Sequence, residues 1–355
     1  MTDTLGTRFP GLAPLLRADL LGPLPTSVEP LARLSRMTST ELYIKRDDRS
    51  AAHYGGNKAR KLSFLLGDAT RAGADTLLTV GAFGSHHVLA TSVHGARNGF
   101  AVHAVLLPQP FTPHVERNIL AGLGASATHH PVRHSALAAA EVARVLARLR
   151  LSRRRPYFIP HGGTSPLGAL GYVDAGLELA AQVDAGLTPE PHAVYCALGS
   201  GGTAVGLCVG LAAAGLRVPV VAVRVTPRLV APRVMLDQLV ERVVHDLHTR
   251  DPRFPRVAEA AKHLMHVTDE QRGAGYGKPD DAAQRAAELA LADDVELDPT
   301  YTAKAFAQML QHAEGERRGQ RLLFLHTLSS QDLEPLVSRA PALPRWTDRY
   351  RREQR

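Results

Sequence analysis

The stretch "CALGSGGTAVGL" (residues 196–207) joins a strand to a helix through a glycine-rich loop. The residues "HAVYCAL" (192–198) have the apolar and β-branched composition of a buried strand, and we expect the helix to begin at Gly202. Loops that directly follow strands carry the ligands in open α/β sheets. The stretch therefore predicts an α/β fold with a binding loop at residues 199–203.

The chemistry of this loop suits a phosphate group. Its three glycines let backbone N–H groups turn towards one point, and the helix N-terminus adds partial positive charge. Ser200 and Thr203 supply hydroxyls. No Gly-Lys-Ser/Thr follows, so this is not a Walker loop, and Arg224 stands where a dinucleotide fingerprint has an acidic residue, about 20 positions on. A glycine-rich connector without a ligand is the alternative.

Strands and helices alternate along most of the chain. The predicted strands are residues 75–81, 101–107, 156–160, 192–198, 218–225 and 321–326. Alternation of this kind predicts parallel sheets that helices cover on both faces. The strands form two series, so we expect two open, twisted parallel-sheet domains with the active site in the cleft between them.

The break between the two series, near residues 160–172, sets the expected domain boundaries. Residues 1–55 together with 161–355 form the predicted large domain, which carries the phosphate loop, and residues 56–160 form a small substrate-side domain. A chain of 355 residues with 45% hydrophobic content is long enough to fill two such cores.

Composition argues against several classes of protein. No apolar run is long enough to cross a membrane, and the first residues lack the pattern of a secretory signal. Cys196 and Cys208 lack metal-type spacing, which disfavours disulfides and zinc and favours the cytoplasm. The net charge of +8 reflects arginine clusters at 147–155 and 345–355 without a nucleic-acid-binding motif. We interpret the clusters as a solvated face and a loose tail, and expect no nucleic-acid or membrane partner.

A second strand–loop–helix junction lies at "TVGAFGSHHVLATSVHG" (79–95). Gly81, Gly84 and Ser85 lie between the strand and the helix, where backbone N–H groups can hold a carboxylate. The adjacent histidines at 86 and 87 point in different directions, and no nearby carboxylate completes a ligand set. We therefore expect no metal here.

The stretch "HYGGNKARKL" (53–62) allows two interpretations. It can be a helix start, with Asn57 as N-cap and basic residues facing solvent. Alternatively, Lys58 can be a nucleophile, its pKa lowered by the nearby cations Arg60 and Lys61 and by partial burial. This stretch alone favours the first interpretation. A lysine, a phosphate loop and a carboxylate loop together favour the second, because pyridoxal 5′-phosphate chemistry needs these three features.

The chain resembles the D-cysteine desulfhydrase / 1-aminocyclopropane-1-carboxylate deaminase family of pyridoxal-phosphate enzymes, which have the tryptophan-synthase-β fold (fold type II). The stretch "LYIKRDDRSAAHYGGNKARKLSFLL" (42–66) carries the family signature. Further matching segments follow in the family's order at residues 21–35, 73–87, 161–173, 199–207 and 297–305.

This resemblance implies roles for particular residues. Lys58 forms the covalent link to the cofactor, and Thr302 meets the cofactor's ring nitrogen. Ser85 binds the substrate carboxylate, or acts as a nucleophile or proton carrier. The other implied residues contact cofactor or substrate: Asn57, His86, Gly199, Ser200, Gly201, Gly202 and Thr203 bind the cofactor, and Tyr276 and Tyr301 face the substrate.

Two segments depart from the family pattern. The family usually reads Gln-Ser-Asn-His at residues 84–87, where this chain has Gly-Ser-His-His. It also reads His-Thr-Gly-Gly at residues 326–329, where this chain has His-Thr-Leu-Ser. Because residue 86 is expected to touch the cofactor and Leu328 to narrow the site, these departures bear on the identity of the substrate.

The resemblance implies β-elimination and deamination of a small, D-cysteine-like amino acid to a 2-oxo acid and ammonia. 1-Aminocyclopropane-1-carboxylate deamination and a specialised biosynthetic elimination are the alternatives among enzymes. A cofactor-binding relative with weakened catalysis is the alternative from another class. The family's deaminase branch has Tyr-Glu at residues 301–302, whereas the desulfhydrase branch has Tyr-Thr, as here. The family also implies a homodimer.

Overall fold

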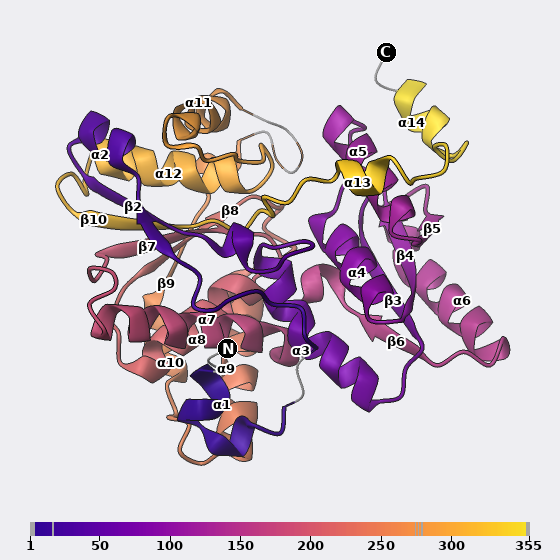
Figure 1. Ribbon diagram of the computed structural model, residues 1–355, viewed down its shortest axis with the longest axis horizontal. Coiled ribbons are helices and arrows are strands. Elements are labelled where there is room, and N and C mark those ends of the chain that lie inside the picture. Colours follow the sequence, from indigo (N-terminus) through magenta and orange to yellow (C-terminus); the bar gives the residue numbers. More distant parts are fainter. Residues whose placement is uncertain (1–3, 16–17, 274, 276, 278–279, 353–355) are drawn as a thin grey trace. The chain divides into compact units, whose positions relative to one another are not determined.

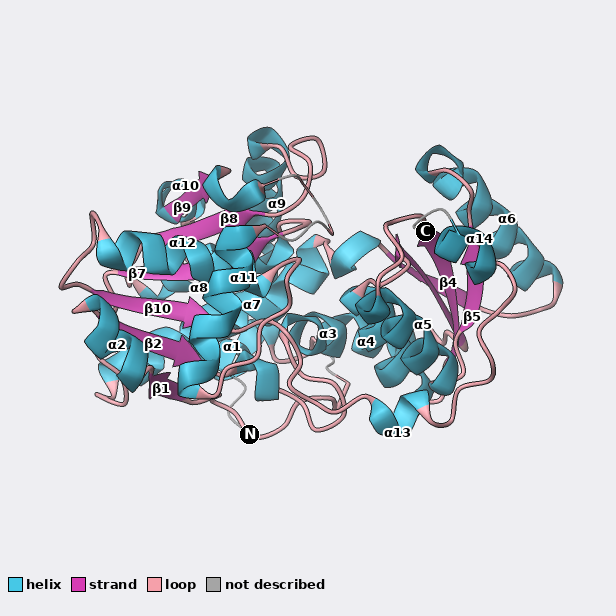
Figure 2. Ribbon diagram, turned by 90° about the horizontal axis from the view of Figure 1, so that it is seen from above, coloured by secondary structure: helices cyan, strands magenta, loops and turns pink. Residues whose placement is uncertain are grey.

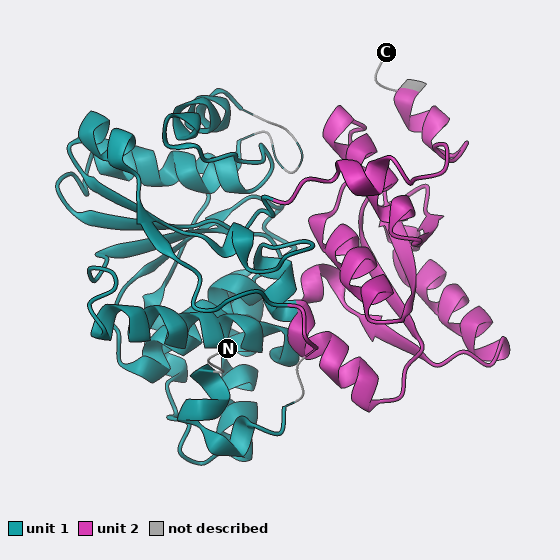
Figure 3. Ribbon diagram, viewed as in Figure 1, with its two compact units in different colours: residues 1–15, 21–61, 164–330 teal, residues 16–20, 62–163, 331–355 magenta. Residues whose placement is uncertain are grey.

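The computed structural model describes residues 4–15, 18–273, 275, 277 and 280–352. It divides into two compact units, which are coloured separately in Figure 3. Unit 1 comprises Met1–Leu15, Leu21–Lys61 and Thr164–Ser330, and unit 2 comprises Leu16–Leu20, Leu62–Gly163 and Gln331–Arg355.

Unit 1 is built on a six-stranded sheet (Figure 2). Strand β1 pairs antiparallel with β2 at one edge, and all other neighbours are parallel. In spatial order the strands are β1 (Val28–Pro30), β2 (Glu41–Lys45), β10 (Arg321–Leu325), β7 (Ala193–Leu198), β8 (Val220–Arg224) and β9 (Met265–Thr268).

Helices cover both faces of this sheet (Figure 1). One face carries α2 (Ala32–Thr38), α11 (Asp281–Ala290) and α12 (Thr302–Glu314), and the other carries α7 (Pro166–Asp184), α8 (Gly202–Ala214), α9 (Arg233–Arg250) and α10 (Ala258–Leu264). Phe306 and Met309 of α12 pack with Phe324 and Tyr195 of the sheet. Helices α7 and α8 approach closely, since a Cβ at Gly206 would lie 2.3 Å from the carbonyl oxygen of Ala169.

Unit 2 contains a four-stranded, wholly parallel sheet. Its strands, in spatial order, are β5 (Thr128–Pro131), β4 (Ala101–Leu107), β3 (Thr76–Ala82) and β6 (Pro156–Ile159). Helix α3 (Asn57–Arg71) enters this unit from unit 1, and α4 (His86–Arg97), α5 (Pro113–Gly124), α6 (Ala138–Leu151), α13 (Glu334–Val337) and α14 (Thr347–Arg352) complete it. One core lies between the sheet and α6, and another lies beneath α5.

These two sheets confirm the predicted α/β class and its two parallel-sheet domains. All six predicted strands are present, and four further strands were missed: β1, β2, β5 and β9. Of these, β1, β5 and β9 lie at sheet edges. Edge strands are only partly covered and therefore lack the continuous apolar run by which buried parallel strands are recognised. Among the described residues, no helix is long and apolar enough to cross a membrane.

The division into units differs from the expected domain boundaries in two places. The first boundary falls after Lys61, because α3 is a single helix that belongs to unit 1 over its first turn. Residues 331–355 belong to unit 2, because Trp346 and Tyr350 pack against the core that contains Phe83. The C-terminal segment was expected to be a loose tail, but its described part packs against this core.

Candidate active site

The loop that follows β7 has a backbone shape that requires glycine. Gly201 has φ 94°, in the left-handed region that favours glycine, and it directly precedes α8. A Cβ at Gly201 would lie 2.3 Å from Leu236 Cδ2, and a Cβ at Gly199 would lie 3.2 Å from Tyr301 Cε1. The glycines therefore allow the loop to turn tightly between α9 and Tyr301.

The first turn of α8 is open to an anion. Within the described chain no side chain caps the start of this helix. The first N–H groups of a helix have no partner within the helix, and they carry partial positive charge. Two hydroxyls also lie at the loop and are hydrogen-bonded to each other, with Ser200 Oγ 2.6 Å from Thr164 Oγ1. This arrangement fits a phosphate group.

A buried lysine lies beside the same turn. A Cβ at Gly202 would lie 2.8 Å from Lys61 Nζ, and the Lys61 side chain is 1% exposed. Burial lowers the pKa of Lys61 well below its ordinary value, and the nearby Lys58 lowers it further. An anion in the loop would favour the charged form of Lys61. Sequence reasoning treated Lys61 only as a cation near Lys58 and did not place it beside the glycine loop. Lys58 and Lys61 are three residues apart on one helix and so share a face.

Lys58 lies in the first turn of α3, next to the loop. The side-chain amide of its neighbour Asn57 donates a hydrogen bond of 3.0 Å to Thr203 Oγ1, which ties this turn to α8. Burial lowers the pKa of Lys58 to about 8, and the charge of Asp298 opposes the shift. An amine with this pKa is partly neutral, and so nucleophilic, near neutral pH.

Arg60 does not cause this shift as predicted, and neither Arg60 nor Lys61 faces solvent, as the alternative helix-start interpretation required. Arg60 is 1% exposed, and its Nη2 lies 2.8 Å from Asp47 Oδ1 and 2.9 Å from Glu178 Oε1. The two carboxylates hold its charge in place and raise its pKa further. Burial, and not a neighbouring cation, is what makes Lys58 less basic.

Tyr301 and Thr302 lie at the start of α12, where Asp298 forms hydrogen bonds with both. The Asp298 carboxylate accepts hydrogen bonds from the N–H groups of Thr300 (2.9 Å) and Tyr301 (2.7 Å). It also accepts the Thr302 hydroxyl at 2.7 Å, and that hydroxyl accepts the Asp298 N–H at 2.8 Å. Asp298 thus orients both predicted residues. Sequence reasoning did not single it out, although an Asp just before a helix start is a capping signal.

Unit 2 carries the second predicted loop. Ser85 caps α4, its Oγ accepting the Val88 N–H at 3.4 Å, and the side chain is 7% exposed. The His86 ring lies 5.0 Å from that of His114. A Cβ at Gly84 would lie 2.8 Å from Val115 Cγ2, so the close approach of α5 leaves no room for the family's glutamine.

The predicted residues thus fall into two groups. Unit 1 brings together Lys58, Asn57, Gly199, Ser200, Gly201, Gly202, Thr203, Tyr301 and Thr302, and unit 2 holds Ser85 and His86. Tyr276 lies outside the described residues. Among the described residues no cluster of three metal-binding side chains occurs. The glycine loop at residues 199–203 has the buried Lys61 beside it and the weakly basic amine of Lys58 next to it. Together these features fit a group that has both a phosphate and an aldehyde.

Known proteins share this sequence and fold. The family described as pyridoxal-phosphate-dependent enzyme matches residues 20–327. D-cysteine desulfhydrase of Salmonella newport is 36% identical over 332 residues, which cover 90% of this chain and 94% of that protein. The crystal structure of an ACC (1-aminocyclopropane-1-carboxylate) deaminase homologue has a TM-score of 0.78 and 29% identity, and covers 96% of this chain and 100% of its own.

A more distant structure shares the fold alone. Threonine deaminase isoform 2 from Solanum lycopersicum has a TM-score of 0.59 at 14% identity, over 96% of this chain and 88% of its own. The match of the family over most of the chain, together with a desulfhydrase relative above 30% identity, confirms the resemblance drawn from the sequence. The chain belongs to the family of pyridoxal-phosphate-dependent enzymes.

Proposed function

We propose that the protein eliminates the β-substituent of a small amino acid such as D-cysteine. In this reaction D-cysteine and water give pyruvate, ammonia and hydrogen sulfide. The observation that carries the proposal is the position of Lys58, an amine of pKa about 8, in the turn that Asn57 ties to the glycine loop. The 36% identity to a D-cysteine desulfhydrase supports this substrate class.

The chain's own residues would hold the cofactor as follows. The N–H groups at the start of α8, with Ser200 and Lys61, bind the phosphate. Lys58 forms the covalent link, and Thr302 faces the ring nitrogen. When bound, the cofactor supplies an aldehyde that captures amines and a ring that stabilises negative charge at the substrate's Cα. We assign the cofactor-phosphate site to the large domain, which corresponds to unit 1, and the substrate-side residue Ser85 to the small domain, which corresponds to unit 2.

The remaining residues would act on the substrate. Ser85 and the N–H groups at the start of α4 bind the substrate carboxylate, because a helix N-terminus favours an anion. The amine of Lys58, in its free form, would take the α-proton, for which its pKa of about 8 is suited. Tyr301 would serve as a further proton carrier, and the family resemblance implies the same role for Tyr276, which lies outside the described residues.

We expect pyruvate release from D-cysteine to exceed 2-oxobutyrate release from 1-aminocyclopropane-1-carboxylate. A carboxylate in contact with the ring nitrogen favours its protonated form and strengthens electron withdrawal. Here residue 302 is a neutral threonine, and both its hydroxyl and its backbone N–H donate to the Asp298 carboxylate. Loss of a thiolate tolerates this weaker withdrawal, whereas opening a cyclopropane does not.

The measurement compares both substrates, and L-cysteine, by the 2-oxo acid released from the pyridoxal-phosphate-loaded protein. Faster turnover of the cyclopropane would contradict the assignment of reaction type. A cofactor-loaded protein that releases no 2-oxo acid from a panel of small D- and L-amino acids would instead support a cofactor-binding relative with weakened catalysis.

We further propose that the protein is a cytoplasmic homodimer. Both cysteines are buried and free, which suits a reducing compartment. Leu229, Val234 and Met235 are 90%, 60% and 54% exposed on one short segment at the start of α9. Neighbouring exposed apolar side chains of this kind mark protein–protein contacts.

Leu229→Asp is therefore expected to shift the protein from dimer to monomer in analytical ultracentrifugation. The control is Leu151→Asp, because Leu151 is 86% exposed at the end of α6 and belongs to unit 2, whereas Leu229 belongs to unit 1. A wild-type monomer, or a dimer that survives Leu229→Asp, would show that this segment is not the dimer contact.

A further inference from the structure

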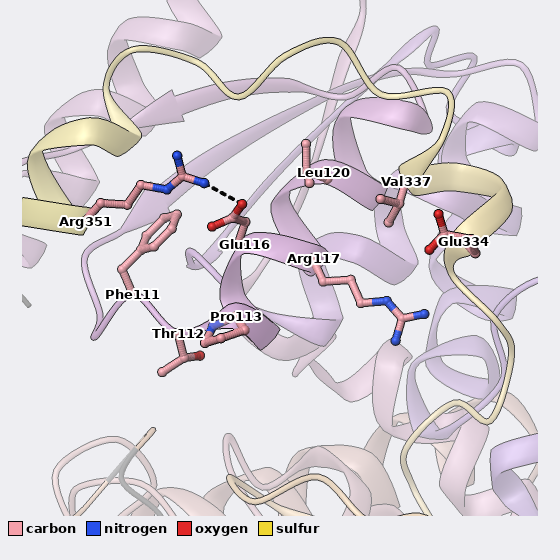
Figure 4. Close-up of a pocket in the computed structure, with 9 residues that line it drawn as sticks. All are labelled: Phe111, Thr112, Pro113, Glu116, Arg117, Leu120, Glu334, Val337 and Arg351. Atoms are coloured by element: carbon pink, nitrogen blue, oxygen red, sulfur yellow. Dashed lines mark hydrogen bonds and ion pairs between the residues drawn. The ribbon is translucent and has the colours of Figure 1, made fainter.

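The C-terminal arm, residues 331–352, packs along α5 within unit 2 (Figures 1 and 3). At the N-terminal end of α5, Arg351 forms an ion pair with Glu116 and lies 5.9 Å from the centre of the Phe111 ring (Figure 4). At the other end, a Cβ at Gly124 would lie 1.9 Å from the carbonyl oxygen of Leu336. The arm is thus attached to α5 at both of its ends.

Between these attachments the arm places two aromatic rings on Phe83. The ring centre of Trp346 lies 5.1 Å from that of Phe83, and the ring centre of Tyr350 lies 4.7 Å from it in an edge-on contact. Phe83 is 2% exposed and forms a core with Leu106 and other apolar residues beneath α5. Contacts between aromatic rings favour defined relative orientations, so they restrict how Phe83 can move.

Phe83 stands two residues before Ser85, in the loop that joins β3 to α4. The backbone of this loop is held on both sides. The Phe83 N–H donates to the Leu107 carbonyl at 3.0 Å, and the Gly84 carbonyl accepts from Asn118 Nδ2 at 2.9 Å. The Phe83 ring is therefore the side-chain anchor of a loop whose next residues are Gly84 and Ser85.

We propose that Trp346 and Tyr350 are positioning residues for Ser85. By holding the Phe83 ring, they keep Ser85 and the first N–H groups of α4 in the geometry that binds the substrate carboxylate. This inference rests on the proposed function through the role of Ser85. A displacement of about 1 Å in such a group is enough to weaken catalysis markedly. The segment from Trp346 to Tyr350 is thus part of the substrate-binding apparatus.

The test replaces Trp346 by leucine in the full-length, pyridoxal-phosphate-loaded protein. We expect faster amide hydrogen exchange in residues 82–86 and a KM for D-cysteine raised about tenfold, with a smaller change in kcat. The dissociation constant for pyridoxal phosphate stays within about twofold, because the phosphate loop belongs to unit 1. Trp346→Phe, which keeps an aromatic ring, restores most of the wild-type KM.

Arg117→Ala is the matched control. Arg117 pairs with Asp332 at 3.2 Å, joining the same arm to α5, but both side chains are exposed, at 51% and 67%. Exposed pairs of this kind contribute little, so exchange in residues 82–86 and KM should stay at wild-type values.

Tyr350→Leu tests the second ring and covers the case in which Trp346→Leu does not fold. Trp346 is the single tryptophan of the sequence, so its fluorescence reports whether the arm is still docked in this variant.

Wild-type exchange and KM in the folded leucine variants would overturn the proposal, as would a parallel rise in KM and in the cofactor dissociation constant. A Ser85→Ala variant with unchanged KM would instead contradict the proposed role of Ser85, whatever the exchange in residues 82–86 shows.

Discussion

Lys58→Ala is expected to abolish the borohydride-reducible cofactor adduct and to reduce turnover by about 10³-fold or more. The variant loses the one amine that the structure places in the turn tied to the glycine loop with a pKa of about 8. Because burial disfavours the charged form of Lys58, its removal should not lower the free energy of unfolding near neutral pH. Reduction with borohydride, followed by peptide mapping of the adduct, measures the result.

Lys61→Met is the matched control, because Lys61 is a second buried amine three residues further along α3. This variant should keep the adduct at residue 58 and bind the cofactor more weakly. An adduct that persists in Lys58→Ala, at Lys61 or elsewhere, would contradict the assignment.

The pKa of Lys58 also predicts a pH dependence for cofactor capture by the apoprotein. With a pKa of about 8, the neutral amine accumulates as the pH rises through 8, rather than through the ordinary value of 10.5. The rate at which the apoprotein captures pyridoxal phosphate should therefore rise between about pH 7 and 9 and then level off. A rise that continues towards pH 10 would show that Lys58 has an ordinary pKa.

Gly201→Val is expected to weaken pyridoxal-phosphate binding by about 100-fold. Its Cβ would lie 2.3 Å from Leu236 Cδ2, and the branched side chain disfavours the left-handed backbone at φ 94°. Both effects force the loop away from the shape that points its N–H groups at one anion, and loss of two or three such hydrogen bonds accounts for this change. Fluorescence titration of the apoprotein with the cofactor gives the dissociation constant.

Gly215→Val separates binding from backbone strain. Gly215 has φ 83° at the C-terminal end of the same helix, and a Cβ there would meet no atom of the described residues within 4 Å. Both variants carry a similar backbone penalty from the left-handed conformation, about 1–2 kcal/mol, to which Gly201→Val adds its clash with Leu236, but only Gly201→Val should lose cofactor affinity. Equal affinities in the two variants would mean that the phosphate binds elsewhere.

The α/β class and the glycine loop could be predicted because both are encoded locally. Buried parallel strands are continuous apolar runs, and a glycine pair between a strand and a helix indicates a tight turn within a few residues. Residues 53–62 alone favoured a plain helix start, and Lys58 was selected only together with the two glycine-containing loops and the family resemblance. Three of the four missed strands lie at sheet edges, where partial exposure weakens the apolar pattern.

Tertiary structure decided what surrounds these residues. Arg60 looked like a cation that acts on Lys58, but it pairs with Glu178, 118 positions away, and no local pattern shows such a partner. Asp298 likewise reaches Lys58 electrostatically only in the folded chain.

The C-terminus shows the same limit. Its arginines indicated a loose tail, yet Trp346 and Tyr350 pack on Phe83, more than 260 positions earlier. Periodicity and composition determine which segments become strands, helices and glycine-rich turns, because those depend on neighbours in sequence. Which charges are neutralised, and which loop the C-terminal arm holds, depends on contacts between distant segments. Only the packed fold creates those contacts.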